Sequence, residues 1–323
     1  MPRAISIDTI RDAARHVYEA AVRTPLVPLG ALTPGGPAIF LKLETLQPIG
    51  SFKIRGAYNA VRKLAPAALA QGVWTVSAGN AAQGVALAAR KAGVACSVMV
   101  MDTAPQAKLR NIERLGATIV TATYDECWRT VETHRSDRMT GHFVHPFDDD
   151  DFISGNGTAG LEIVEDLPEV DAVVAAVGGG GLLAGIGVAV RALKPDARIY
   201  AAEPATAAPL QRSFERGRAS RFDEWQSSFV DGAGGKSVLD TMWPLLRDYV
   251  TESIVVSLAE VSAAMRLTAE RSRVIAEGAG ACAVAAAISP RLAARGHRNI
   301  VAVVSGGNID LSKFAQLVDA DTL

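Results

Sequence analysis

The chain has 323 residues, 49% of them hydrophobic and 21% charged, a composition typical of a soluble globular protein long enough for two domains. Its 33 basic and 34 acidic side chains leave a net charge of -1 and form no polybasic run, so neither nucleic acid nor an anionic membrane is an expected partner. We therefore expect a small-molecule ligand.

The first apolar residues form no secretory signal region but recur at the spacing of an amphipathic helix: Ile7, Ile10, Ala14, Val17 and Ala21. The three cysteines have no metal-ligand spacing and suit a reducing compartment, which predicts buried thiols in a cytoplasmic protein: Cys96, Cys127 and Cys282. Because the chain ends soon after its last expected strand, no appended regulatory domain is expected.

Further along the chain, short β-rich runs alternate with Ala-rich amphipathic stretches, which predicts α/β units with mostly parallel sheet. The expected strands are residues 39–43, 73–77, 96–101, 118–121, 172–177, 199–202 and 300–304. The expected helices are residues 81–92, 106–115, 182–193 and 258–271. Residues 148–151, an acidic run after His145-Pro146, are the best candidate for a crossing between domains, and residues 210–240 predict an irregular surface connection.

The first motif that carries chemistry surrounds Lys53. Pro48-Ile49-Gly50 predicts a turn, and Ser51 is a good N-cap for a helix that would place Lys53 in its first turn. There the helix dipole, with Phe52 and Ile54 beside the amine, can lower the pKa of Lys53 and make it a nucleophile or base. On this motif alone, a lysine so placed is more commonly a solvated surface residue.

The second motif, Ser77-Ala78-Gly79-Asn80-Ala81-Ala82-Gln83-Gly84, lies where a strand passes into a helix. Small residues and free backbone amides at a helix N-terminus suit a carboxylate, and the Asn80 side chain can bond a phenolic oxygen. A tight turn that Asn80 merely caps is an equal alternative on these residues alone.

The third motif is a run of four glycines, Gly178, Gly179, Gly180 and Gly181, between a strand and a helix that starts near Leu182. The uncharged segment 172–190 is long enough to resemble a membrane span, but the glycines would break it, so we expect a buried strand, a glycine turn and a helix. Consecutive glycine amides and the helix dipole suit one phosphate group. The dinucleotide fingerprint fails because its third glycine would fall on Leu183.

The fourth motif, Val304-Ser305-Gly306-Gly307-Asn308, ends the last apolar strand. Ligands of α/β sheets bind beyond the carboxyl ends of strands, which is where Ser305 is expected. A glycine turn with a capping serine is the structural alternative.

Together and in this order, the four motifs resemble those of fold-type II pyridoxal-phosphate enzymes, in particular the serine/threonine dehydratase and serine racemase group. The resemblance extends from Thr24-Pro25-Leu26 to Ser305-Gly306-Gly307-Asn308. It implies a tryptophan synthase β-like α/β fold with mostly parallel sheets and the cofactor between two domains. The large domain would comprise residues 1–72 and 148–323, the small mobile domain residues 73–147, and the protein would be a homodimer.

The resemblance also implies roles for individual residues. Lys53 would hold pyridoxal 5'-phosphate as an imine and remove the Cα proton of an amino acid; Phe52 would pack beside the ring. Asn80 would bond the phenolic oxygen and Ser305 the pyridine nitrogen. The phosphate would lie on the glycines and the start of the helix (Gly178, Gly179, Gly180, Gly181, Leu182), and the substrate carboxylate on Ser77, Ala78, Gly79, Asn80 and Ala81. Gly232 and Glu277 would line the pocket.

The implied reaction is β-elimination, because a neutral serine at the ring nitrogen favours prompt loss of a β-leaving group. A β-hydroxy amino acid such as threonine or serine would give a 2-oxo acid and ammonia, the reaction of an ammonia-lyase. Ala78 stands where racemases of the group have a serine, which argues against the alternative of an amino-acid racemase. Ala81 replaces a common histidine and opens space for a bulkier substrate such as 3-phenylserine.

A divalent-metal site of the group is matched by Glu203 and Ala207, but Pro209 replaces its aspartate, so no metal is expected and Glu203 could be an exposed strand-end carboxylate. A second alternative function, from another class, is a nicotinamide-dependent oxidoreductase with an unusual glycine loop.

Overall fold

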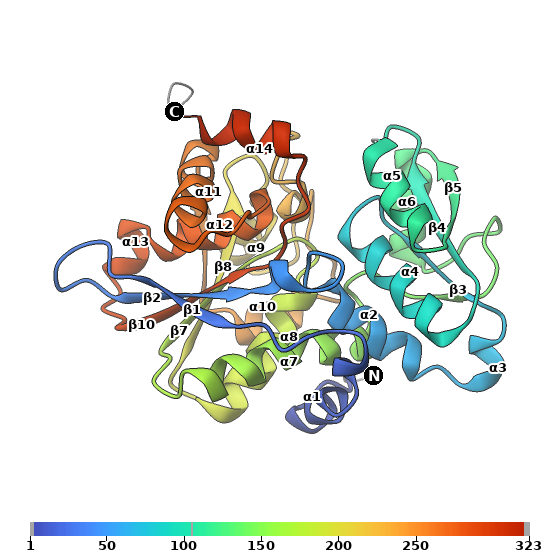
Figure 1. Cartoon of the computed structure of the whole chain (residues 1–323), viewed down its shortest axis with the longest axis horizontal. Coiled ribbons are helices and arrows are strands. Elements are labelled where there is room, and N and C mark those ends of the chain that lie inside the picture. Colours follow the sequence, from blue (N-terminus) through green and yellow to red (C-terminus); the bar gives the residue numbers. More distant parts are fainter. Residues whose placement is uncertain (1–2, 105, 320–323) are drawn as a thin grey trace.

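Two separate β-sheets organise the chain (Figure 1). The computed structural model describes residues 3–104 and 106–319. The larger sheet has six strands in the order β1-β2-β10-β7-β8-β9, and the smaller has four in the order β5-β4-β3-β6. Among the described residues β1 and β2 pair antiparallel and the other strand pairs are parallel, which agrees with the predicted α/β class.

The two sheets use separate parts of the sequence. The larger consists of β1 (Leu26–Gly30), β2 (Ala38–Leu43), β7 (Ala172–Ala176), β8 (Arg198–Pro204), β9 (Glu252–Val256) and β10 (Asn299–Val304). The smaller consists of β3 (Val73–Val76), β4 (Cys96–Met101), β5 (Thr118–Ala122) and β6 (His142–Phe143). The proposed division of the chain at residues 72/73 and 147/148 remains a prediction.

Helices cover both sheets. The first half of the chain has α1 (Ile7–Ala14), α2 (Lys53–Arg62), α3 (Pro66–Leu69), α4 (Asn80–Ala92), α5 (Gln106–Arg114), α6 (Tyr124–Thr133) and α7 (Asp150–Asp166). The second half has α8 (Gly181–Leu193), α9 (Pro209–Arg216), α10 (Trp243–Tyr249), α11 (Leu258–Ser272), α12 (Gly278–Ala287), α13 (Pro290–Ala293) and α14 (Leu311–Val318). Three 3-10 turns are η1 (Val17–Glu19), η2 (Glu44–Leu46) and η3 (Asp231–Ala233).

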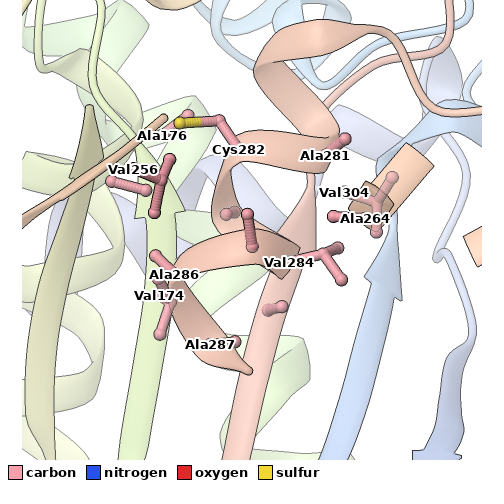
Figure 2. Packing of buried hydrophobic residues seen from close by; sticks show 14 of the residues in the cluster. Val174, Ala176, Val256, Ala264, Ala281, Cys282, Val284, Ala286, Ala287 and Val304 are labelled. Carbon is pink, nitrogen blue, oxygen red and sulfur yellow. The ribbon is translucent and has the colours of Figure 1, made fainter. Parts of the chain in front are cut away.

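Helix α12 lies in the core of the larger part and is buried at every position. Its residues are Gly, Ala, Cys and Val only, which is typical of a helix enclosed on all sides. Figure 2 shows its side chains against residues of the strands and of α11: Val174, Ala176, Val256, Val304 and Ala264. This helix therefore fixes the positions of β7 and β10, whose ends carry two of the motifs.

Helix α2, which carries Lys53, lies between the two sheets and packs against both α4 and α7 (Figure 1). Glycines allow this close approach: a Cβ at Gly84 would lie 3.0 Å from the Lys53 carbonyl oxygen, and one at Gly155 would lie 2.4 Å from that of Arg55. Since real Cβ atoms do not come within 3.0 Å of backbone atoms, the helices need glycine at Gly155, and a side chain at Gly84 would push its neighbours away by a few tenths of an ångström. The lysine helix is thus held from both sides.

A buried ionic network stabilises the other side of α2. Arg55 is fully buried and bonds Glu44 (Nε–Oε2 2.8 Å) and Glu162 (Nη1–Oε1 2.6 Å). Lys42, also buried, lies 2.6 Å from Glu162. Two cations thus face two carboxylates. Because removing one partner of a buried pair leaves an uncompensated charge, the network fixes how α2, β2 and α7 meet.

Several predictions are confirmed and some are wrong. Segment 172–190 is the expected strand, glycine turn and helix, and no helix among the described residues is long and apolar enough to cross a membrane. The three cysteines are free and buried. The N-terminal helix, however, ends at Ala14, Val17 lies in the turn η1, and Ala21 follows that turn. Residues 210–240 are not wholly irregular, because α9 occupies their start.

Candidate active site

Lys53 lies in the first turn of α2, as predicted, but Ser51 is not its cap. The N-cap position is Phe52, without a side-chain cap bond, and Ser51 instead forms a bridge with Gly306 at the end of β10. The Phe52 amide donates to the Ser305 carbonyl oxygen (3.0 Å). The lysine motif and the serine motif are therefore joined directly through the backbone.

The Lys53 amine is surrounded by apolar groups. Its Nζ lies 5.2 Å from the centre of the Phe52 ring and 5.3 Å from that of Phe152, and it donates to the Pro146 carbonyl oxygen (2.5 Å). Burial penalises the ammonium form and lowers the pKa of Lys53 to about 8. The expected direction of this shift is found, with burial as its cause instead of the helix dipole. A substantial fraction of the amine is then neutral and nucleophilic near neutral pH.

The glycine run forms an anion site at the N-terminus of α8. The backbone N–H groups of residues 178–183 find no acceptor among the described residues, although this helix start is largely buried. Gly180 is the N-cap with φ +90°, a left-handed conformation that favours glycine. Unpaired buried N–H groups at a helix N-terminus are costly unless an anion binds them, so this loop suits a phosphate group.

Steric contacts explain why the other three positions are glycine. A Cβ at Gly178 would lie 2.7 Å from the Gly232 carbonyl oxygen, and one at Gly179 would lie 2.1 Å from the Phe147 ring. One at Gly181 would lie 2.7 Å from the Phe147 carbonyl oxygen. Residue 147 follows Pro146, to which Lys53 donates, so the glycine loop and the lysine meet across the segment 146–147.

The loop before α4 leaves a second set of free amides. The N–H groups of Asn80, Ala81 and Ala82 have no acceptor among the described residues, whereas the Gly79 amide donates to the Ser77 hydroxyl (3.1 Å). A Cβ at Gly79 would meet nothing within 4 Å, so this loop borders open space. Free amides beside open space suit a small carboxylate.

Asn80 does not cap α4, since the N-cap is Gly79. Its Nδ2 donates to Glu277 Oε1 (2.7 Å), and its Oδ1 accepts from Asn308 Nδ2 (2.7 Å). Burial, with Asp231 nearby, raises the pKa of Glu277 to about 7. Gly232 is close to the same carboxylate, because a Cβ added at this glycine would lie 3.6 Å from Glu277 Oε1. Asn80, Glu277 and Gly232 are thus brought together, as their predicted roles require.

Ser305 follows β10 at the carboxyl end of the sheet, as expected. It is buried, and its hydroxyl has no hydrogen-bond partner among the described residues. A hydroxyl without a protein partner is free to bond a ligand atom such as a ring nitrogen.

Glu203 is not an exposed carboxylate: it is fully buried. Its two oxygens accept the amides of Leu210 and Gln211 at the start of α9 (2.8 Å each), and Oε2 also accepts the Ser253 hydroxyl (2.6 Å). Burial raises the pKa of Glu203 to about 7. The carboxylate caps a helix here, and the absence of a metal at these residues remains a prediction.

One other group of side chains has the composition of a metal site: His134, His145 and Asp148, whose ligand atoms lie within 4.8 Å of one another. His145, however, uses both ring nitrogens, because Nδ1 accepts the Asp148 amide (2.7 Å) and Nε2 faces the Val131 carbonyl oxygen (3.1 Å). Burial lowers the pKa of His145 to about 3, so the ring is neutral. Its role is to order the segment that follows it.

Sequence reasoning missed Pro146, Phe147, Phe152 and Asn308. The first two follow His145 in a segment that resembles an ordinary domain crossing, and Phe152 resembles a core residue. Asn308 belongs to the fourth motif, but its partner Asn80 is 228 positions away, so nothing in the local sequence reveals the contact.

The four motifs thus converge on an enzyme site with an amine, two anion sites and a free hydroxyl. The chain belongs to the pyridoxal-phosphate dependent enzyme family, whose model matches residues 17–306. It is 38% identical over 319 residues to an L-threonine ammonia-lyase of Thermotoga maritima, covering 98% of this chain and 78% of that protein. It is 37% identical over 317 residues to serine racemase of Homo sapiens, covering 95% and 92%.

Solved structures agree with the fold. Maize serine racemase superimposes with a TM-score of 0.88 at 33% identity over 97% of this chain and 96% of that one. The processed threonine deaminase isoform 2 of Solanum lycopersicum does so with a TM-score of 0.87 at 31% identity over 98% and 90%. The predicted fold-type II class and the cofactor pyridoxal phosphate are confirmed, and the nicotinamide alternative is excluded.

Proposed function

We propose that the chain is an ammonia-lyase that removes water from a β-hydroxy amino acid and releases a 2-oxo acid and ammonia. The observation that carries this proposal is the enclosed amine of Lys53, with its lowered pKa, beside a carboxylate loop with no acid at Ala78. The relatives include an L-threonine ammonia-lyase and a serine racemase, so the family alone leaves elimination and racemisation open.

In this proposal each group of residues has one task. The bound cofactor supplies the electron sink that makes the Cα–H bond acidic. Lys53 Nζ would take the Cα proton, the β-carbon–oxygen bond would break, and the hydroxyl would leave as water with the proton that Nζ gives up. The released enamine then hydrolyses to the 2-oxo acid and ammonia. The amides of residues 80–82 hold the carboxylate, those of residues 178–183 hold the phosphate, and Asn80 and Ser305 orient the ring.

The absence of an acid at Ala78 disfavours racemisation, because a proton must be delivered to the opposite face of Cα for the enantiomer to form. Ser77, the nearest hydroxyl in the loop, accepts the Gly79 amide. A serine racemase activity remains the alternative, and chiral analysis of recovered substrate distinguishes it from elimination. We further propose a homodimer in the cytoplasm.

The test is borohydride reduction of the yellow protein followed by peptide mass spectrometry, together with a panel of β-hydroxy amino acids assayed for 2-oxo acid. We expect the reduced cofactor on Lys53, and 2-oxo acid formation much faster than loss of enantiomeric purity. The variant Lys53→Ala should lose both the adduct and the activity. An adduct on another lysine, or faster racemisation than elimination, would overturn the proposal.

The substrate is proposed to be bulkier than threonine, because Ala81 replaces a larger residue in the first turn of α4, beside the carboxylate loop. We predict that Ala81→His lowers kcat/KM for 3-phenylserine by roughly tenfold or more relative to threonine, since a filled pocket discriminates by about 1–3 kcal/mol. Ala81→Ser, which adds little volume, is the control. An unchanged ratio in Ala81→His would contradict the proposed substrate class.

A further inference from the structure

Asn308 connects three parts of the site that are far apart in sequence. Its side-chain Nδ2 donates to the Ile49 carbonyl oxygen (2.7 Å) and to Asn80 Oδ1 (2.7 Å), and its backbone amide donates to Glu277 Oε2 (3.1 Å). Gly50, with φ +70°, permits this approach, because a Cβ added at this position would lie 2.6 Å from Asn308 Oδ1. The turn before Lys53 is therefore shaped around this asparagine.

These contacts determine which way round the Asn80 amide lies. The Ile49 carbonyl oxygen can only accept, so the atom of Asn308 that faces it must be the NH2 group. The second hydrogen of that NH2 then points to Asn80, whose facing atom must be an oxygen. The Asn80 NH2 consequently faces the Glu277 carboxylate, where a carboxylate oxygen accepts it. The reversed amide would place its oxygen against the Glu277 carboxylate and its NH2 group against the NH2 group of Asn308.

One N–H of Asn80 remains after these bonds are made. Its NH2 group has two hydrogens, and the structure assigns one of them to Glu277. Glu277 itself cannot move away easily: it is buried, and a Cβ at Gly306 would lie 2.5 Å from its Oε1. The charged groups that act on it are Asp231 and Lys108, with hydrogen bonds from Asn80 and Asn308.

We propose that Asn308 and Glu277 are positioning residues that fix the Asn80 amide, so that its second N–H is offered to the phenolic oxygen of the cofactor. This inference rests on the proposed function, in which Asn80 faces that oxygen. The donor stabilises negative charge on the phenolic oxygen and therefore favours the form of the bound cofactor that absorbs at long wavelength. A reversed amide would present its oxygen there and favour the short-wavelength form.

The experiment compares the visible spectra and the cofactor affinities of reconstituted variants. Asn80→Ala serves as the reference for loss of the donor. Asn308→Asp keeps the shape but replaces the donor towards Asn80 with an acceptor, which favours the reversed amide. We expect it to shift the two absorbance bands in the same direction as Asn80→Ala and to weaken cofactor binding roughly three- to tenfold. Glu277→Gln, which can still accept from Asn80, should shift the bands less.

The outcomes separate this inference from the proposed function. If Asn80→Ala shifts the spectrum but Asn308→Asp and Asn308→Ala do not, the positioning role is overturned while the adduct on Lys53 stands. If the Asn308 variants change only the thermal stability and leave the spectrum unchanged, the positioning role is likewise overturned. If Asn308→Asp does not fold, Asn308→Ala provides the test, with a smaller shift expected. If Asn80→Ala leaves the spectrum of the Lys53 adduct unchanged, Asn80 does not face the phenolic oxygen and the inference is overturned.

Discussion

At the scale of single residues, the site depends on burial of groups that are charged in water. The Lys53 amine lies near two aromatic rings and donates to a carbonyl oxygen, and its burial lowers the pKa to about 8. Glu277 is buried beside Asn80, and burial raises its pKa to about 7. Burial thus shifts both groups towards their neutral forms.

The pKa of Lys53 predicts how the cofactor attaches. Because only the neutral amine attacks an aldehyde, the rate of attachment should rise with pH and level off above a midpoint of about 8. Stopped-flow absorbance of the apoprotein mixed with pyridoxal phosphate between pH 6 and 10 measures this. Lys53→Ala, which has no such amine, provides the baseline. A midpoint near the ordinary lysine value of 10.5 would contradict the enclosed environment.

At the scale of elements, the local sequence pattern predicted most strands and several helices. It missed elements that are defined by their packing in the folded protein and show no periodicity of their own. Helix α12 has no polar face, and an Ala- and Gly-rich segment without periodicity gives no helical signal. Residues 148–151 resembled a crossing, yet Asp149 caps α7 by accepting the Phe152 amide (2.7 Å), and acidic residues follow in its first turn. Because acidic side chains favour a helix N-terminus, this run is also the typical start of a helix.

Helix α9 illustrates the same limit, since the free amides of its first turn are bonded by the side chain of Glu203 on the preceding strand β8. We predict that Glu203→Ala destabilises the protein by about 1–3 kcal/mol, because the amides of Leu210 and Gln211 and the Ser253 hydroxyl lose their acceptor. Urea unfolding measures this, with the exposed Glu215→Ala as control. Since both oxygens of Glu203 are occupied, a chelator should change neither the unfolding midpoint nor the activity.

The contribution of Glu203 to the free energy of unfolding should fall as the pH rises. Burial raises the pKa of Glu203 from 4.5 to about 7 in the folded state, so the folded chain holds a proton that the unfolded chain has released. The contribution of Glu203 to stability is therefore fully present below pH 4.5 and is lost as the pH rises towards 7. Glu203→Gln, which does not titrate, should flatten this part of the stability curve. An unchanged slope would contradict the shift.

At the scale of the whole molecule, contacts across the site join the helices of the smaller sheet to residues 222–237 of the larger part. Lys108 on α5 pairs with Asp231, and the Lys236 amine lies over the rings of Tyr124 (4.1 Å) and Trp225 (4.3 Å). Lys108 and Asp231 are exposed enough for salt to screen them, whereas a cation between two aromatic rings is less sensitive to salt.

We predict that Lys236→Ala lowers kcat/KM roughly two- to tenfold without changing the spectrum of the bound cofactor, because it removes a contact that holds the two parts together around the substrate. Lys108→Ala should have a smaller effect that disappears at high salt. Steady-state kinetics at low and high ionic strength measure both. Lys194→Ala, a lysine far from these contacts in sequence, is the control. Equal loss in the control would show that the contact has no such role.

The motifs themselves could be predicted from sequence because each is a short run with its own chemistry. The positions of their partners could not, because Lys53 meets Pro146, and Asn80 meets Asn308, only through the packing of α2 and α4 between the sheets. The buried network of Arg55 was equally invisible, since charged residues are usually exposed. The short motifs thus identified the residues expected to bind the ligand, whereas the packing of the fold determines how those residues are arranged.

The place of β10 in the larger sheet has a consequence for biosynthesis. This strand comes near the end of the chain yet lies between β2 and β7, and it carries Ser305 and leads to Asn308. While the ribosome is still translating residues before β10, the lysine helix can already form, but the ring-binding end of the site is missing. A nascent chain halted before this strand would have a gap between β2 and β7 and would lack Ser305 and Asn308, although Lys53 and the glycine loop would already be made.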